Sequence, residues 1–343
     1  KKMIYLFFKR KTFIVFIILF LLINSCGVKR ASIGADNELV VIASLKDRKS
    51  TEVILQNIFD DTVFTPQPEP VYKIKFIDPK NFEDLKQQTS LIVSSFGNDL
   101  KNSGTKLVRQ LLGEKKFIET ISGNDQFIIS KDQFAKNQLF MIVNSPNESS
   151  ILESLSGKEN WIKGLFEEKY NSRQKSFLFS DARQTELEQR LLNTYYWSMK
   201  IPWGWSIIKE TPDSNFIWFG KELPYQWVSV QWQQLSNTLD SLYVKNMIYE
   251  FPEINYKNIQ FNSYKFNLDQ GINDTWFDWE ASGIWESIQE AKGGPFKLFI
   301  KLDNLNNRIF LINFLIHYPG ENKSNYMRQM ELIASTINFE NIK

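Results

Sequence analysis

Hydrophobic residues in the first half of the chain fall into short runs separated by polar stretches. Such runs predict buried strands, and they lie at residues 39–42, 91–93, 127–129 and 139–143. Residues 71–77 alternate between apolar and polar, which predicts one more strand. Ile54, Leu55, Ile58 and Phe59 share one face of a predicted helix. Strands alternating with helices predict an α/β or α+β domain, which we place at residues 38–192.

The second half, residues 193–343, has shorter alternating segments separated by turns. Strands are predicted at 195–201, 206–209, 216–219, 226–232, 264–268, 276–281, 296–301 and 308–318. One helix is predicted at 240–249. A closing helix at 324–337 places Tyr326, Met330, Ile333 and Ile337 on one face. We therefore predict a Trp-rich antiparallel α+β domain, an α/β sandwich in which the C-terminal helix covers the sheet.

The first 26 residues have the pattern of an export signal. A basic segment, Lys9–Thr12, precedes an apolar run at 13–23, and Asn24 and Ser25 lead to Cys26. The run is about half of the ~20 residues that a spanning helix needs. The residues Ile23-Asn24-Ser25-Cys26 resemble a bacterial lipobox. The resemblance implies cleavage of a signal peptide at 1–25, a lipid on Cys26 and a tether at 26–37. An uncleaved membrane anchor and a plain secretory signal are the alternatives.

Cys26 is the only cysteine of the chain. Cysteines of exported proteins usually form disulfide pairs, so a single one is unusual unless lipidation consumes its thiol. Two or more acyl chains hold a protein stably on a membrane. Because no acidic run follows Cys26, we expect the periplasmic face of the outer membrane.

The charge of the chain argues against nucleic acid as a partner. The chain has 41 basic and 39 acidic residues, and five of the basic ones lie in residues 1–25. The remainder carries 36 basic against 39 acidic residues, which is nearly neutral. Nucleic-acid-binding domains are usually strongly basic.

Several stretches together resemble a family of Bacteroidota lipoproteins that carry a domain of unknown function. They are residues 38–41, 66–70 (Pro-Gln-Pro-Glu-Pro), 282–285, 293–296 and 325–331. The resemblance implies no activity. The layout of the second half is also similar to a PsbP-type sandwich, with its Ile-Pro-Trp-Gly-Trp entry at 201–205 and its last helix. Such a likeness concerns the fold and implies no function.

The sequence contains no recognisable catalytic, metal or cofactor motif. His317 is the only histidine, and we expect it to be hydrogen-bonded under or beside the last helix. A zinc site would need clustered ligands. Neither a Gly-x-Ser-x-Gly elbow nor a phosphate-binding Gly-x-x-x-x-Gly-Lys loop occurs. We therefore expect no metal and no cofactor.

Two groups of residues are candidates for binding. On a strand, Trp276, Asp278 and Glu280 share one face, with the carboxylates ~7 Å apart. Such a pair beside an aromatic residue is compatible with glycoside hydrolysis, with ligand binding or with a solvated face. Trp203 and Trp205 lie in a predicted turn, where two indoles are difficult to bury, and could bind a partner or glycan.

The sequence favours a lipid-anchored, non-enzymatic envelope protein that binds an envelope protein or a glycan through its aromatic half. The alternative is a carbohydrate-active enzyme that uses Asp278 and Glu280. A structural envelope component without a small ligand is a third possibility.

Overall fold

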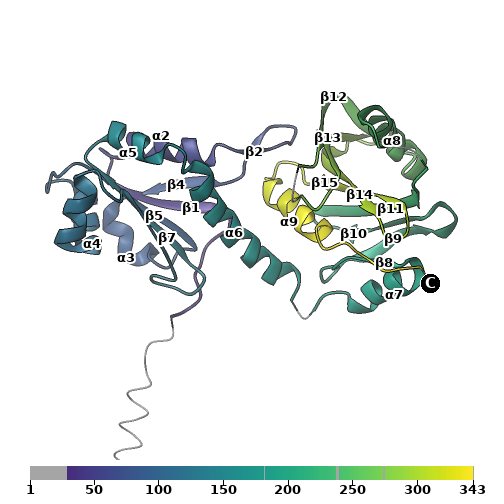
Figure 1. Ribbon diagram of the computed structural model, residues 1–343, viewed down its shortest axis with the longest axis horizontal. Helices are drawn as coiled ribbons and strands as arrows, with labels where there is room; N and C mark the ends of the chain where they lie inside the picture. The colour runs from purple at the N-terminus through teal and green to yellow at the C-terminus, as the bar shows by residue number, and fades with distance from the viewer. Residues whose placement is uncertain (1–28, 181, 237–238, 273–274, 343) are drawn as a thin grey trace, which may run out of the picture. The chain divides into compact units, whose positions relative to one another are not determined.

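The computed structural model describes residues 29–180, 182–236, 239–272 and 275–342. The predicted signal peptide at 1–25 and Cys26 lie outside these residues. The described chain divides into two compact units (Figure 1). The first contains residues up to 35, 40–47 and 76–146, and the second contains residues 36–39, 48–75 and 147 onward. The predicted domain bounds of 38–192 and 193–343 stay predictions.

The first unit contains most of a five-stranded sheet of order β4-β1-β5-β7-β6. The strands are β1 (Glu38–Ala43), β4 (Lys73–Ile77), β5 (Ser90–Phe96), β6 (Phe127–Lys131) and β7 (Leu139–Ser145). β5 is parallel to β1 and β7, while β6 is antiparallel to β7. Val40, Leu91 and Phe140 pack with Val108 and Phe117 of α4 (Ser103–Ile121) in one core. The short α3 (Phe82–Leu85) adds Phe82 to it. The predicted strands at 39–42, 91–93 and 139–143 are confirmed as buried, whereas the strand at 127–129 forms but is only half-buried.

Three helices and a short hairpin open the second unit. The helices are α2 (Arg48–Phe59), α5 (Glu148–Leu155) and α6 (Glu159–Leu178). Strands β2 (Thr62–Val63) and β3 (Glu69–Pro70) pair antiparallel, and we call residues 61–71 the hairpin. Ile54, Leu55, Ile58 and Phe59 are buried, as their helical spacing predicts. The ring of Phe59 lies 5.0 Å from that of Phe166, which attaches α2 to α6.

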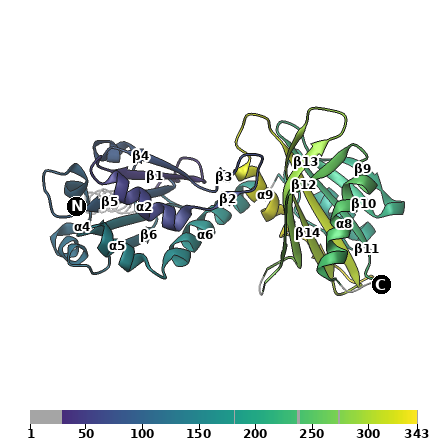
Figure 2. The same cartoon turned by 90° about the horizontal axis from the view of Figure 1, so that it is seen from above.

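The rest of the second unit is a seven-stranded antiparallel sheet of order β12-β13-β14-β15-β11-β10-β9. Its strands are β9 (Ser206–Thr211), β10 (Phe216–Lys221), β11 (Tyr225–Gln234), β12 (Ile259–Gln270), β13 (Trp279–Ser287), β14 (Gly293–Asp303) and β15 (Arg308–His317). Helix α9 (Ser324–Ala334) lies on one face and α8 (Ser241–Asn255) on the other (Figure 2). The α+β class and the antiparallel sheet covered by the C-terminal helix are confirmed.

Strand β15 shows how alternation builds the two cores of this sandwich. Its residues Ile312, Phe314 and Ile316 join the core under α9, with Met330 and Ile333. Leu311 and Leu315 point the other way, into the core under α8. Successive side chains of a strand face opposite sides, so one strand contributes to both cores.

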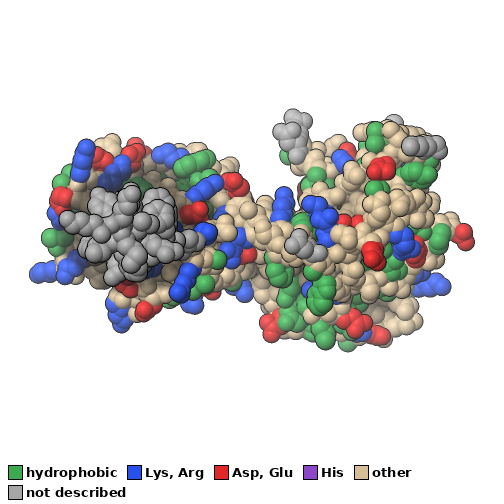
Figure 3. Space-filling model, turned by 90° about the horizontal axis from the view of Figure 1, so that it is seen from below, with side chains coloured by type: hydrophobic (Ala, Val, Ile, Leu, Met, Phe, Trp, Pro, Cys, Tyr) green, Lys and Arg blue, Asp and Glu red, His purple; other side chains and the backbone are tan. Residues whose placement is uncertain are grey.

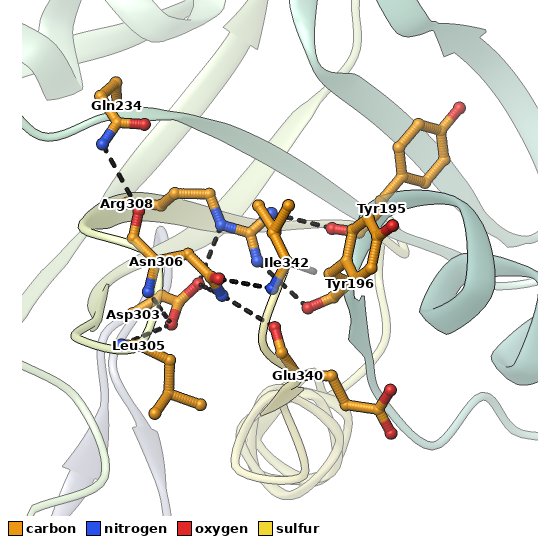
Figure 4. A network of polar contacts seen from close by, with 9 residues as sticks. All are labelled: Tyr195, Tyr196, Gln234, Asp303, Leu305, Asn306, Arg308, Glu340 and Ile342. Atoms are coloured by element: carbon orange, nitrogen blue, oxygen red, sulfur yellow. Dashed lines mark hydrogen bonds and ion pairs between the residues drawn. The ribbon is translucent and has the colours of Figure 1, made fainter.

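The predicted strand at 195–201 is wrong in most of its length. Helix α7 (Thr185–Tyr195) continues to Tyr195, and Tyr196 ends it with a left-handed backbone, φ 59°. Only Trp197 and Ser198 form a strand, β8, which pairs with β16 (Asn338–Phe339). Arg308 fixes this junction because its guanidinium donates to the carbonyl oxygens of Tyr195 (2.8 Å) and Tyr196 (3.1 Å) (Figure 4).

Arg308 belongs to a closed set of polar contacts that we call the Asp303–Arg308 network. Its Nε donates to Asp303 Oδ2 at 2.8 Å, and both side chains are buried. Asn306 donates to Asp303 and to the carbonyl oxygen of Glu340, while its own Oδ1 accepts from the amide of Ile342 (Figure 4). The network therefore ties the β14–β15 turn to the start of β8 and to the C-terminal segment.

Candidate functional site

The two predicted turn tryptophans lie in different environments. Trp203 is 74% exposed, whereas Trp205 is only 3% exposed. The expectation that the turn leaves both indoles accessible is therefore wrong for Trp205. Its ring packs 6.0 Å from that of Phe219 in the core under α9, and its carbonyl oxygen accepts from Gln184 Nε2. Trp205 immediately precedes β9, so it already packs as part of the sheet.

Trp276 and Asp278 lie just before β13, which begins at Trp279 rather than at residue 276. The prediction that strand alternation places Trp276, Asp278 and Glu280 on one face is therefore wrong. The ring of Trp276 packs 4.6 Å from that of Phe299. Asp278 Oδ2 accepts from the amide of Leu302 at 2.8 Å and lies 3.7 Å from Lys301 Nζ. Asp278 thus helps to fix the start of β13 on β14.

Glu280 contributes to a second polar cluster, on the α9 side of the sheet. Lys297 Nζ lies 2.5 Å from Glu280 Oε1 and 2.6 Å from Glu331 Oε1. Burial raises the pKa of Glu280, although the charge of Lys297 works against that increase. Burial alone would lower the pKa of Lys297, but Glu331 and Glu280 raise it above its usual range. Lys297 is therefore a charged ammonium group held between two carboxylates.

This cluster borders a cavity of about 470 Å³ that we call the hairpin pocket. One wall comes from the hairpin and consists of Asp61, Thr62, Val63, Phe64, Pro68 and Val71. The other walls come from α6, α9 and the sheet, and consist of Glu167, Arg328, Glu331, Asn267, Ser282 and Lys297. A cavity lined by apolar, hydroxyl, amide and charged groups can contact a small polar molecule.

Arg328 lines the pocket and contacts two residues of α6. Its Nη2 lies 2.6 Å from Glu167 Oε2, and its guanidinium carbon lies 3.3 Å from the centre of the Tyr170 ring. Burial would lower the pKa of Arg328, but Tyr170 and Glu167 raise it. The hydroxyl of Tyr170 donates to Asn325 Oδ1 at 2.6 Å. Helix α6 is thereby fastened to α9 by a stacked, charged side chain.

The hairpin lies beside α9 (Figure 2). Glu69 fastens it to the start of this helix. Glu69 Oε2 accepts from the amides of Lys323 at 2.6 Å and Ser324 at 2.8 Å. A carboxylate at a helix N-terminus satisfies free amides and interacts favourably with the helix dipole. Lys265 Nζ adds a hydrogen bond of 3.1 Å to the carbonyl oxygen of Pro66. The motif at 66–70 thus fastens the hairpin, and its Pro68 lines the pocket.

His317 lies at the end of β15, and its Nδ1 is 2.8 Å from the carbonyl oxygen of Gly293. Its ring lies 6.1 Å from that of Trp285, which belongs to the core under α8. The predicted hydrogen bond is confirmed, but on the face opposite α9, because His317 shares the alternation of Leu315. Within the described ranges no group of three His, Cys, Asp or Glu residues could hold a metal ion.

Acidic and basic side chains are intermingled on the surface shown in Figure 3. No helix in the described part of the chain is both long enough and apolar enough to cross a membrane.

Sequence reasoning placed Glu280 in a candidate site but missed its partners Lys297 and Glu331, and it missed Glu69 and Arg328. The sequence contained one indication of this polar cluster. Arg328 and Glu331 are polar residues on the closing helix, and they are three positions apart. Residues at this spacing lie on one side of a helix.

Comparison with known families finds two matches. Residues 32–178 match a domain of unknown function, DUF8532, and residues 184–336 match another, DUF4837. No curated protein matches the chain.

Solved structures show weak similarity to part of the chain. The Saccharomyces cerevisiae Ran-binding protein Mog1p is 10% identical, with a TM-score of 0.32, and the match covers 43% of this chain and 93% of that one. A mutant of protein Mog1 is 9% identical, with a TM-score of 0.31 and coverages of 43% and 92%. The cyanobacterial PsbP of Synechocystis is 10% identical, with a TM-score of 0.28 and coverages of 42% and 87%. Similarities this weak carry no inference about function.

Proposed function

We propose that this protein is a lipid-anchored, non-enzymatic binding protein of the cell envelope, and that the hairpin pocket is its ligand site. The pocket is the observation that carries the proposal. Its volume of about 470 Å³ falls within the ~300–1,000 Å³ typical of small-molecule sites. Its walls come from the hairpin, two helices and three strands, so the fold brings distant segments together around one cavity.

A pocket-filling substitution tests this site. Asn267 lies on β12 at the pocket wall, and its side chain is exposed. Asn267→Trp should therefore obstruct the pocket without disturbing the core. Gln260→Trp, on the same strand and outside the pocket, is the matched control. In a thermal-shift screen of a small-molecule library, compounds that stabilise the natural chain and the Gln260→Trp variant should not stabilise Asn267→Trp. Equal stabilisation of all three proteins, or none, would contradict the proposal.

The anchor rests on the lipobox-like residues Ile23–Cys26. The absence of an acidic run after Cys26 favours the periplasmic face of the outer membrane, and the resemblance to Bacteroidota lipoproteins agrees with that location. Cys26→Ser should release the protein into the soluble fraction or leave it uncleaved. Normal processing with unchanged membrane association would show that Cys26 is not the anchor.

A non-enzymatic role is favoured by what Asp278 and Glu280 contact. Asp278 accepts from a backbone amide, and Glu280 is paired with Lys297. Both carboxylates therefore have structural partners. The alternative is a carbohydrate-active enzyme that uses this pair. Under that alternative, alanine at both positions should abolish the cellular phenotype while the fold is retained, whereas an unchanged phenotype would exclude it.

A role in assembly with an envelope protein is the second candidate. Trp203 is 74% exposed and Leu223 is 89% exposed. Because Ser206 pairs with Gly220, the segments that contain these side chains lie at the same end of the sheet. In-cell crosslinking of the lipidated protein should then capture a partner, and Trp203→Ala should reduce its yield. Crosslinks unchanged by Trp203→Ala would place any partner elsewhere.

A further inference from the structure

We infer that the hairpin pocket takes an uncharged, polyhydroxylated ligand, a sugar unit of a glycan. This inference rests on the proposed function, because it names the ligand class of the same site. Three observations lead to it: the pairing of the charges, the free hydrogen-bonding groups and the apolar part of the wall.

The charges that line the pocket are already paired within the protein. Asp61 pairs with Lys163, and Glu167 pairs with Arg328. Lys297 is shared by Glu331 and Glu280. A charged ligand would have to break one of these pairs or lie beside a charge of its own sign, and unpaired charges in a partly desolvated site are costly. A ligand without formal charge leaves every pair intact.

Uncharged hydrogen-bonding groups of the pocket are available to a ligand. Among the described residues, the side chains of Thr62, Asn267 and Ser282 make no hydrogen bond. One amide and two hydroxyls suit a ligand whose groups both donate and accept. A sugar hydroxyl has this double capacity, whereas an ammonium group only donates and a carboxylate only accepts.

The remaining wall is apolar and suits the carbon-bound face of a sugar ring. Phe64, Pro68 and Val71 of the hairpin line the cavity on this side. Phe64 is half-buried, so part of its ring is available. An aromatic face beside a few directed polar groups gives contact area and orientation together.

Titration calorimetry on the full chain in detergent tests the ligand class. The probes are maltose, cellobiose and N,N′-diacetylchitobiose, with glucosamine and glucuronate as charged comparators. We expect saturable binding of at least one neutral disaccharide. Its affinity should change less than about twofold between 50 and 500 mM salt, because salt screening acts on charges. Asn267→Ala and Ser282→Ala should each weaken it roughly two- to tenfold, the equivalent of one hydrogen bond. The control Gln260→Ala should have no effect.

Two results would overturn the inference, and they differ in what they imply for the proposed function. If only a charged comparator binds, and Asn267→Trp blocks it, the ligand class is wrong and the pocket remains a binding site. If no probe binds, the sugar is rejected. If, in addition, the library screen finds no compound whose stabilisation depends on residue 267, the proposed function fails with it.

Discussion

Two polar clusters in the second unit have similar components but different surroundings. The Asp303–Arg308 network pairs a carboxylate that is 0% exposed with an arginine that is 7% exposed. The pocket cluster places Lys297, which is 16% exposed, between Glu280 at 19% and Glu331 at 35%. The first cluster directs its hydrogen bonds to backbone groups of three segments, whereas the second borders a cavity. A network whose polar groups all bond within the protein indicates a structural role. Polar groups that face a cavity and have no protein partner indicate binding.

The polar contacts of the network and those around the pocket also differ in how far apart their partners lie in the sequence. Asp303 and Arg308 are five residues apart, on either side of one turn. Arg328 and Glu167 are 161 residues apart, and Glu69 lies 255 residues from Ser324. The Asp303–Arg308 ion pair therefore forms across one turn, although the bonds of its network to Tyr195 and Glu340 need distant segments. The pocket requires that the hairpin, α6 and α9 have all come together.

Replacing Arg308 should have the largest effect of the changes considered. Arg308→Met leaves the buried Asp303 carboxylate without its cation and frees the carbonyl oxygens of Tyr195 and Tyr196. Breaking a buried pair by removing one partner typically costs about 3–5 kcal/mol. Urea unfolding should show a loss of this size.

The matched control is Arg190→Met, because Arg190 pairs with Glu210 at the surface and is 44% exposed. Exposed pairs contribute about 0–1 kcal/mol. Equal losses in the two variants would mean that the Asp303–Arg308 network is no more structural than a surface pair.

Replacing Lys297 should have an intermediate effect on stability. Lys297→Met leaves Glu280 and Glu331 without their shared cation, but Glu331 faces the cavity and can be hydrated. We expect a loss of about 1–3 kcal/mol at neutral pH, the penalty of one group left unsatisfied.

The pH dependence of this loss identifies its cause. Burial raises the pKa of Glu280 in the folded state, and removing Lys297 would raise it further. A group whose pKa is raised on folding contributes stability that is present below its unfolded pKa and is lost as the pH rises through its folded pKa. The deficit of Lys297→Met relative to the natural chain should therefore shrink as the pH is lowered from 7 toward 4. A deficit independent of pH would indicate lost packing rather than charge.

Much of the sandwich could be predicted because each element carries its own periodicity. Met330 and Ile333 fix the inward face of α9, and the alternation of Ile312 and Phe314 fixes that of β15. The pocket could not be predicted in the same way. Periodicity says which face of an element is buried, but not which distant element covers it. The predicted strand pattern pointed to Glu280. Glu69 lies in a proline-rich stretch that predicts only irregular structure, and its contact with the start of α9 is visible only in the fold.

The smallest effect is expected at Glu69, and it should be local. Glu69→Gln keeps an acceptor oxygen for the amides of Lys323 and Ser324 but removes the charge that interacts with the start of α9 and with Lys323 Nζ, 3.7 Å away. A charge at a helix terminus is worth about 0.3–1 kcal/mol. Global stability should fall by no more than this.

The hairpin itself should respond more clearly, because its strands have only two residues each and Glu69 fastens it to α9. Hydrogen exchange followed by mass spectrometry should show faster exchange at residues 62–70 in Glu69→Gln, with β15 unchanged. Glu52→Gln, an exposed acid on α2, is the control. If exchange in the hairpin is the same in both variants, Glu69 does not hold the hairpin on α9, and the hairpin depends on the packing of Val63 and Val71 instead. If exchange at residues 62–70 rises only in Glu69→Gln, the hairpin opens while the core stays folded. The pocket side of the second unit is then less rigid than the side closed by the Asp303–Arg308 network.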